Sequence, residues 1–552
     1  MLRKSRTIAL AVIILSLSTV VCTCSSSGTA SPPRNASVID VVANTGLAPW
    51  MGEAVEQFNE AKIETAGGHP VFVRLRLAES GQAVTDMAQG DTPPALWIPD
   101  DPVWINLLAD RGVDGFQGDC ISVAESPLVI AMWQPVAESL GWPGRSLGWL
   151  DVGSLAADPS AWAYYSGGQF GDTLRLGHTH PGISSTGSST LLAIVQAAES
   201  KEEAVNVDDI ERPIVQASVS AFEAAVSWFS SSTDNLGQVM SERGVDFLGA
   251  AVMYESTVIS YGGGDPAIVP IYPFEGTFVA THPACINGSM GAETQEAARL
   301  FRDYLVGEDA QQLAVVHGLR PVNDAVTVGA PLDKDHGVDL GQPEIVFGPP
   351  TVDTVYAVQD LWQEARKDVN LVMLLDTSGS MGGEKIENAR SAAIQFVKQM
   401  GDDDYITIIA FSDSPMVLIY HQQVGPSRDE ITQVIADLQA DGNTTLYDAI
   451  GDGAAIIDDT SSSQMTNAMV VLSDGMDTNS SRFDFNQTLF DKAAANDTTV
   501  FTIAYGRDAD EDLLSELALE TNGNFYKGDE ASIAAIYEEM SAAFGGSAGI
   551  GR

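Results

Sequence analysis

Residues 370–383, NLVMLLDTSGSMGG, run from aliphatic side chains directly into a loop that carries one carboxylate and two hydroxyls. A short, nearly all-apolar run is typical of a strand that a parallel sheet buries on both faces. Asp376, Ser378 and Ser380 follow this strand at alternate positions, so an extended loop can turn all three side chains toward one point. The stretch therefore predicts an α/β fold with polar groups gathered at the carboxyl end of a buried strand.

The sequence after this stretch alternates between apolar strands and amphipathic helices. Expected strands are YITIIAF, MVLIY, AMVVLS and TVFTIAYG, and helices such as KIENARSAAIQFVKQM and DEDLLSELALE separate them. This alternation predicts a doubly wound, mostly parallel sheet over residues 370–545, with helices on both faces. In such a sheet the ligand site lies past the carboxyl ends of the strands, where the strand order reverses.

Two more segments bring oxygen ligands to the same edge. Thr444 lies in DGNTTLYDAI ahead of a helix, and Asp474 follows the strand in VVLSDG. Hydroxyls and carboxylates are hard oxygen donors, which suit Mg²⁺, Mn²⁺ or Ca²⁺ and are poor ligands for zinc. We expect a divalent cation here, Mg²⁺ first and Mn²⁺ or Ca²⁺ as alternatives, with Thr445 as the alternative to Thr444.

The segments DTSGSM, GNTTLYD and LSDG together resemble, in order and spacing, the metal-ion-dependent adhesion site of von Willebrand factor type A domains. The resemblance implies that Ser378, Ser380 and Thr444 bind the metal through their hydroxyls. It implies that Asp376 and Asp474 act mainly through water. It also implies that a protein partner supplies a carboxylate to the vacant metal position, where the ion concentrates positive charge.

The same loop lacks the patterns of two enzyme classes. A nucleophile elbow needs G-x-S-x-G, and neither Ser378 nor Ser380 has glycine at both flanking offsets. A phosphate loop needs G-x-x-x-x-G-K-[ST], and no such lysine follows Gly379. We therefore expect a binding protein and no enzyme. The rival hypothesis is a hydrolase. Catalytic turnover that survives metal removal but is lost in Ser378→Ala would favour that hypothesis.

Two other polar clusters invite a metal assignment. His178 and His180 lie in GHTHPG, and residues 402–404 are three consecutive aspartates. Two histidines without a third ligand bind metal weakly, and adjacent acids do not converge without a dedicated loop. We expect a polar turn at the histidines and a solvated turn at the aspartates.

Residues 37–348 alternate in the same way, with strands SVIDVVAN, VFVRLRLA and SPLVIAM. Their order resembles the type 2 extracellular solute-binding fold, in which two α/β lobes clamp a ligand. The pieces HPGISSTGSSTLLAIVQAA, YESTVISYG and IYPFEGTFVATHPACI also match. The resemblance implies a two-lobed, periplasmic-binding-protein-like α/β domain ahead of the doubly wound sheet.

In that fold the crevice loops would offer hydroxyls and backbone N–H groups at helix N-termini to a small polar or anionic solute. The expected lining residues are Thr45, Ser185, Thr186, Gly187, Ser188, Tyr254 and Glu255. The alternative is a domain that has lost its solute and keeps its shape for packing or protein contact.

The N-terminus resembles a bacterial lipoprotein signal. Basic residues precede the apolar run 8–21, which is short for a membrane span. Cys22 and Cys24 close the run as lipidation candidates, although neither follows the usual small residue. We expect an exported protein, lipid-anchored at the extracellular face of the membrane, with plain cleavage or an uncleaved anchor as alternatives.

The charge and the cysteines of the chain restrict its partners and its covalent links. The formal charge of −47, from 28 basic and 75 acidic residues, excludes nucleic acid and anionic membrane surfaces. Cys120 and Cys285 could pair in an oxidising compartment, with two separately buried thiols as the alternative. The expected segments are 1–24 signal peptide, 25–36 flexible tether, 37–348 solute-binding-like domain, 349–369 linker and helix, and 370–545 von Willebrand factor type A domain.

Together these features predict an exported, membrane-anchored binding or adhesion protein. Its C-terminal domain would bind a divalent cation and dock a protein partner through it. The alternative function is a transport-associated solute receptor whose first domain captures a small polar ligand.

Overall fold

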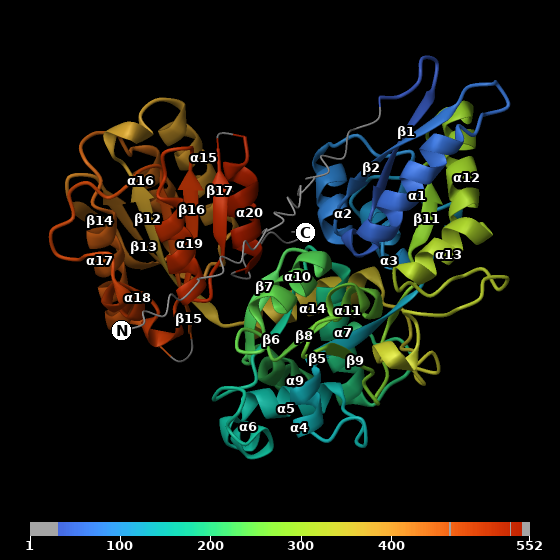
Figure 1. Ribbon diagram of the computed structural model, residues 1–552, viewed down its shortest axis with the longest axis horizontal. Helices are drawn as coiled ribbons and strands as arrows, with labels where there is room; N and C mark the ends of the chain where they lie inside the picture. The colour runs from blue at the N-terminus through green and yellow to red at the C-terminus, as the bar shows by residue number, and fades with distance from the viewer. Residues whose placement is uncertain (1–30, 463–464, 530, 544–552) are drawn as a thin grey trace, which may run out of the picture.

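The computed structural model describes residues 31–462, 465–529 and 531–543 (Figure 1). The expected signal peptide, with Cys22 and Cys24, lies outside the described residues. Among the helices of the described part, none is long and apolar enough to cross a membrane. The described chain forms three α/β units, which are two lobes in the N-terminal half and one sheet with its helices in the C-terminal half (Figure 1).

The first lobe is built on a five-stranded sheet in the order β2-β1-β3-β11-β4. β1 is parallel to β2 and β3, whereas β11 is antiparallel to β3 and β4. Its strands are β1 Ser37–Ala43, β2 Val71–Leu77, β3 Leu96–Ile98, β4 Cys120–Ser122 and β11 Pro283–Ile286. Its helices are η1 Thr45–Leu47, α1 Ala48–Ala61, α2 Ser80–Gln89, α3 Pro102–Asp110, α12 Ala292–Leu305 and α13 Glu308–Val316. A disulfide between Cys120 and Cys285 joins β4 to β11.

The second lobe holds a six-stranded sheet in the order β10-β5-β8-β6-β7, with β9 paired to β5. Its strands are β5 Ser126–Trp133, β6 Leu176–Thr179, β7 Val226–Ser230, β8 Ala250–Tyr254, β9 Ile268–Ile271 and β10 Val279–Ala280. Its helices are α4 Gln134–Ser139, α5 Trp149–Ala157, α6 Pro159–Ser166, α7 Ser185–Glu199, α8 Val207–Ile210, α9 Pro213–Glu223, α10 Thr233–Arg243 and α11 Glu255–Tyr261. The chain enters this lobe after β4 and returns to the first lobe before β11.

The segment after α13 contains η2 Lys334–His336 and leads into α14 Val352–Ala365. α14 contacts both lobes. The Tyr356 hydroxyl donates to Asp110 Oδ2 of the first lobe at 3.2 Å, and Trp362 Nε1 donates to Glu223 Oε2 of the second lobe at 3.0 Å. The linking helix is therefore fastened to the solute-binding-like domain immediately before the C-terminal sheet begins.

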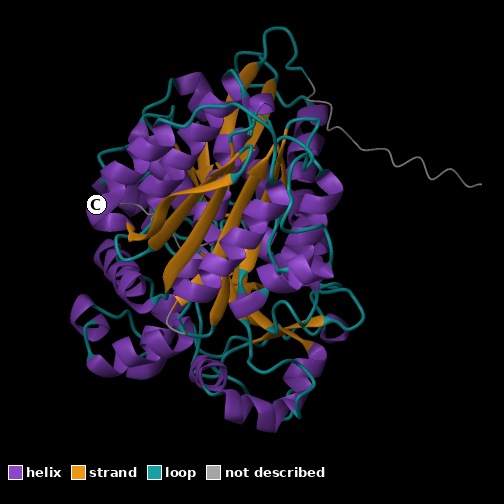
Figure 2. Ribbon diagram, turned by 90° about the vertical axis from the view of Figure 1, so that its left-hand side faces the viewer, coloured by secondary structure: helices purple, strands orange, loops and turns teal. Residues whose placement is uncertain are grey.

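The C-terminal sheet has the order β14-β13-β12-β15-β16-β17, and its neighbouring strands are parallel except at the edge pair β13–β14. Its strands are β12 Asp368–Asp376, β13 Tyr405–Phe411, β14 Pro415–Gln423, β15 Met465–Ser473, β16 Thr499–Tyr505 and β17 Phe525–Gly528. Its helices are η3 Gly379–Met381, α15 Glu384–Gln399, α16 Val424–Ala436, α17 Leu446–Thr460, α18 Gln487–Ala493, η4 Ala495–Asp497, α19 Glu511–Glu520 and α20 Ile533–Ala543. Helices flank the strands on both sides (Figure 2), and the strand order reverses between β12 and β15. The predicted fold class is confirmed.

The apolar runs form these strands because burial stabilises them. Every residue of β12 from Val369 to Asp376 is buried, as are the last seven residues of β15. Each fully buried Val, Leu or Ile contributes about 1.5–3 kcal/mol relative to an exposed side chain. The centre of the sheet is thereby fixed, and the polar residues that follow these two strands are held at one edge.

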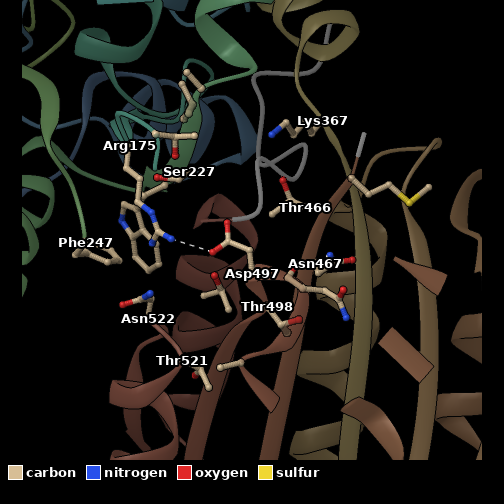
Figure 3. Close-up of a pocket in the computed structure, with 18 of the residues that line it drawn as sticks. Arg175, Ser227, Phe247, Lys367, Thr466, Asn467, Asp497, Thr498, Thr521 and Asn522 are labelled. Carbon is tan, nitrogen blue, oxygen red and sulfur yellow. Dashed lines mark hydrogen bonds and ion pairs between the residues drawn. The ribbon is translucent and has the colours of Figure 1, made fainter. Parts of the chain in front are cut away.

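The C-terminal domain meets the second lobe at the amino ends of β15 and β16. The Trp228 and Phe501 rings stack with their centroids 5.6 Å apart, and Arg175 forms an ion pair with Asp497 at 3.0 Å. A cavity of about 270 Å³ lies at this junction (Figure 3). It is far from the predicted metal loop, because Met465 lines the cavity at one end of β15 and Asp474 follows the other end.

The turn predicted at the histidines is wrong, and the turn predicted at residues 402–404 is confirmed for Asp402 and Asp403 but not for Asp404. His178 lies in β6 with no exposed surface, and its Nε2 is 3.0 Å from Glu223 Oε1. Asp404 is 1% exposed and pairs with Arg366 at 2.9 Å. Buried polar groups of this kind are satisfied by partners distant in sequence, which a local pattern does not reveal.

Candidate functional site

The loop after β12 folds back on its own carboxylate. The backbone N–H of Ser378 donates to Asp376 Oδ1 at 2.8 Å, and η3 then turns the chain so that the Ser378 and Ser380 hydroxyl oxygens lie 2.9 Å apart. The Ser380 hydroxyl donates to Asp474 Oδ1 at 2.7 Å. The three alternate polar residues therefore converge, and they reach the carboxylate that follows β15.

A second link holds the two carboxylates together. The Ser473 hydroxyl donates to Asp376 Oδ2 at 2.6 Å. On the other side, the Lys385 ammonium, in the first turn of α15, contacts Asp474 Oδ2. Asp376 and Asp474 thus lie side by side at the ends of β12 and β15, which is the point where the strand order reverses.

Thr444 reaches the same place from a third segment. Its carbonyl oxygen accepts hydrogen bonds from the N–H groups of Thr478 and Asn479 at 2.9 and 3.0 Å. A Cβ atom built on Gly475 would be 3.9 Å from both the Ser380 and the Thr444 hydroxyl oxygens. The neighbouring Thr445 is the N-terminal cap residue of α17, and its buried hydroxyl has no hydrogen-bond partner among the described residues.

The site combines buried acids with an open rim. Asp376, Ser378 and Asp474 are at most 1% exposed, whereas Ser380 is exposed. Burial raises the pKa of Asp376, and the neighbouring Asp474 raises it further, while hydrogen bonds from Ser378 and Ser473 lower it. Two buried carboxylates with one lysine beside them leave a deficit of positive charge, which a cation reached through the rim would relieve.

The donor set fits a hard divalent cation. In the described part of the chain, no group of three or more His, Cys, Asp or Glu side chains could hold a metal ion. Here the hydroxyls of Ser378, Ser380 and Thr444 would complete a set of oxygens with the two aspartates, and Mg²⁺ readily keeps waters in its remaining positions.

The predicted solute site divides into two groups. Thr45 and Tyr254 lie between the lobes, where Thr45 hydrogen-bonds to Glu79 and Tyr254 to Asp100. Ser185 hydrogen-bonds to Tyr254. These three residues lie at the contact between the lobes, and their binding of a solute stays a prediction.

The other four differ from their expected place, because Thr186, Gly187 and Ser188 contact residues of the second lobe and Glu255 pairs with Arg320 in the segment after α13. The Thr186 hydroxyl lies 2.6 Å from that of Thr179, and the Ser188 hydroxyl bonds to backbone of its own helix. A Cβ on Gly187 would lie 2.2 Å from the Thr179 carbonyl oxygen, so this glycine permits close packing of α7 on β6. Both oxygens of Glu255 bind the Arg320 guanidinium, at 2.9 and 2.6 Å.

The crevice residues that sequence reasoning missed are acids and amides at strand ends. Asn44 follows β1, Glu79 follows β2 and Asp100 follows β3. Burial, with a further contribution from the Glu79 charge, raises the pKa of Asp100 to about 8. The rule that ligands lie past the carboxyl ends of parallel strands could have found all three.

Two protein families match this chain. Residues 370–539 match the von Willebrand factor type A domain, and residues 39–320 match the bacterial extracellular solute-binding proteins.

Curated relatives match the C-terminal domain. The uncharacterized protein sll0103 of Synechocystis is 28% identical over 163 residues, covering 29% of this chain and 38% of the relative. Mouse inter-alpha-trypsin inhibitor heavy chain H3 is 25% identical over 185 residues, covering 31% of this chain and 21% of the relative. The chain therefore spans well under two thirds of the length of either relative.

Among solved structures, the sulfate-binding protein SubI from Mycobacterium tuberculosis H37Rv is 18% identical, with a TM-score of 0.41. That match covers 58% of this chain and 96% of the other. The family match over residues 39–320 extends through half of the chain. The protein belongs to the bacterial extracellular solute-binding proteins and carries a von Willebrand factor type A domain in its C-terminal half.

Proposed function

We propose that this chain is an exported adhesion protein whose C-terminal domain binds a divalent cation and docks a protein partner through it. Both matched families are of binding types, and an extracellular family supports export. One observation carries the proposal. Ser380 bonds to both Ser378 and Asp474, and the Ser380 and Thr444 hydroxyls both lie near Gly475, so three segments distant in sequence bring their oxygens to one edge of the sheet.

In this proposal the five residues of the cation site have two roles. Ser378, Ser380 and Thr444 offer hydroxyl oxygens directly, while Asp376 and Asp474 orient bound water and the serines. The bound ion would present concentrated positive charge to a carboxylate of the partner. The backbone N–H of Ser378 and the Ser473 hydroxyl fix the Asp376 carboxylate, so the site is preorganised.

Membrane attachment is part of the same proposal. Cys22 or Cys24 would carry the lipid, and residues 25–36, rich in Ser and Pro, would tether the folded part to it. The partner would then be met at the extracellular face of the membrane. Mass measurement of the membrane-bound protein, with each cysteine changed to Ser in turn, identifies the lipidated residue.

The test is partner capture by the full chain in Mg²⁺ and in chelator. We expect capture in Mg²⁺ that chelator abolishes and that Ser378→Ala abolishes equally. Ser220→Ala, on the exposed face of α9, is the matched control and should leave capture intact. Capture that is indifferent to chelator and to Ser378→Ala would contradict the proposal.

A second candidate function is solute reception, which membership of the solute-binding family favours. Under this alternative the first domain captures a small polar ligand between its lobes, and the C-terminal domain contacts a membrane partner. Loss of partner capture on altering the residues between the lobes, with no effect of chelator, would favour it.

A further inference from the structure

The two lobes of the first domain touch backbone to backbone. Gly81 and Gln82, in the first turn of α2, donate their N–H groups to the Ile183 carbonyl oxygen of the second lobe at 2.8 and 3.1 Å. A Cβ on Gly81 would lie only 2.5 Å from the Gly182 carbonyl oxygen. The first amides of a helix have no partner within it, so here the opposite lobe satisfies them.

Side chains cross the crevice from both lobes. Tyr254 of the second lobe hydrogen-bonds to Asp100 of the first. Glu79, from the first lobe, accepts a hydrogen bond from the backbone N–H of Thr233 at 3.2 Å, and Thr233 is the first residue of α10 in the second lobe. The side chain of Ser184, the cap residue of α7, also bonds to this carboxylate. From its own lobe, Thr45 and Asn44 complete the contacts.

The donors around Glu79 are those that suit an anion. A backbone N–H at a helix start, two hydroxyls and an amide surround one carboxylate that is 3% exposed. Helix N-termini favour negative charge, and hydrogen bonds to a carboxylate are about twice as strong as those between neutral groups. The anion-binding groups of the second lobe are therefore occupied by a carboxylate from the first lobe.

The acids between the lobes have no basic partner, in the described residues, that could also bind a second anion. Across the described residues, neither Glu79 nor Asp100 forms an ion pair with Lys, Arg or His. Asn44 Nδ2 donates to both carboxylates, at 3.4 Å to Glu79 and 2.9 Å to Asp100. Asp100 Oδ1 is buried, and no other described residue offers it a hydrogen bond. An anionic solute would meet two buried acids and donors already in use.

We propose that the crevice between the lobes is occupied by the chain's own Glu79, which takes the position of an anionic solute and keeps the lobes closed. The inference does not depend on the cation site. The first domain is then a closed module that binds its own carboxylate. Inorganic anions are excluded as its solute, whereas the sequence indicated a small polar or anionic solute.

Hydrogen exchange of the full chain tests this, because the Gly81 and Gln82 amides donate their hydrogen bonds, among the described residues, to the opposite lobe. After dialysis against sulfate-free and phosphate-free buffer, we expect these amides to stay protected in the wild type. In Glu79→Ala they should exchange about tenfold faster or more. Glu275→Ala is the matched control, since Glu275 accepts from the Trp149 and Leu150 N–H groups at the start of α5, within the second lobe. Its loss should leave both amides protected.

Titration of the wild type with inorganic sulfate and inorganic phosphate gives a second readout that needs no variant. We expect no binding of either anion between the lobes. Equal protection of the two amides in the wild type and Glu79→Ala would overturn the proposal. So would micromolar binding of sulfate or phosphate that increases their protection. If Glu79→Ala does not fold, Glu79→Gln, which keeps one acceptor oxygen for Thr233, should show a smaller acceleration, and an unchanged rate would count against the proposal.

Discussion

At the edge of the C-terminal sheet, Asp376 and Asp474 lie beneath an exposed Ser380, with one lysine as counter-charge. Between the lobes, Glu79 and Asp100 are equally buried, but Thr45, which contacts Glu79, is only partly exposed, and no cation pairs with either acid in the described residues. Both regions place acids and hydroxyls past the carboxyl ends of parallel strands. The first arrangement is open to an external ion, whereas the second is closed by a carboxylate of the chain itself.

The difference shows that acids and hydroxyls of the same kind can either satisfy one another inside the protein or bind an external ion. Around Glu79 the donors belong to helix starts and hydroxyls, and they satisfy the carboxylate internally. Around Asp376 and Asp474 the hydroxyls can turn their lone pairs to a metal, because a hydroxyl both donates and accepts. What decides the outcome is access from solvent, not residue type.

The largest expected effect separates the two domains. Cys120→Ser with Cys285→Ser should destabilise the first lobe by about 2–4 kcal/mol, because the bridge closes a long loop. All nine tryptophans precede residue 370, so their fluorescence in a denaturant titration reports the N-terminal half and, through Trp228 on Phe501, its junction with the C-terminal domain. Reductant should lower the stability of the wild type and have no further effect on the variant. Quantitative labelling of both wild-type thiols without denaturant would contradict this.

The next effect concerns the charge between the lobes. The pKa of Asp100, raised to about 8 by burial and by Glu79, means that the folded state holds a proton that the unfolded state releases. Stability from this group is present below the unfolded pKa and is lost as pH rises through about 8. Between about pH 6.5 and pH 9, Asp100→Asn should remove about 2 kcal/mol of the fall in unfolding free energy, at about 1.4 kcal/mol for each pH unit below about 8.

The same fluorescence titration, repeated across pH, measures this effect. Asp86→Asn is the matched control, because Asp86 lies in the same lobe and pairs with Arg76 at 3.0 Å. An unchanged pH dependence in Asp100→Asn would mean that the crevice is hydrated and open, and the contrast between the two regions would disappear.

A smaller effect sharpens the cation site. Thr444→Ala should weaken Mg²⁺ binding about tenfold, or about 1.4 kcal/mol, because one oxygen ligand is lost. Thr445→Ala removes a hydroxyl that is one residue away, buried and without a hydrogen-bond partner in the described part of the chain, and should leave the affinity unchanged. Calorimetric titration of both variants decides the matter, and the reverse order would make Thr445 the ligand.

The smallest effect lies at the junction of the domains. Asp497 is 80% exposed in its ion pair with Arg175, so solvent screens the pair and Arg175→Ala should cost less than about 1 kcal/mol. The cost should fall further in high salt. A double-mutant cycle with Asp497→Ala measures the coupling, and a coupling well above this value would show that the junction is tighter than its polar contacts indicate.

The sequence predicted the C-terminal domain far better than the crevice, for a physical reason. The strands β12, β13, β15 and β16 are long apolar runs, and the residues at their ends carry a local pattern. β17 was missed because Phe525–Gly528 has only four residues, with one fully buried. Asp404 was misplaced because its partner Arg366 lies in another segment.

The crevice depends on contacts between distant segments. Glu79 meets Thr233 across 154 positions, and no periodicity or motif signals such a pair. Glu255 was expected in the crevice because it is adjacent to Tyr254, but it begins α11 and its carboxylate binds Arg320. Strand ends predict where ligands gather, whereas the identity of the facing residues needs the three-dimensional fold.

The most direct test of the account is calorimetric titration of the full chain with Mg²⁺ and with Mn²⁺. The account predicts one ion bound per chain, lost in Asp376→Ala and retained in Asp491→Ala, which removes an exposed acid from α18 of the same domain. No binding by the wild type, or equal binding by Asp376→Ala, would contradict it.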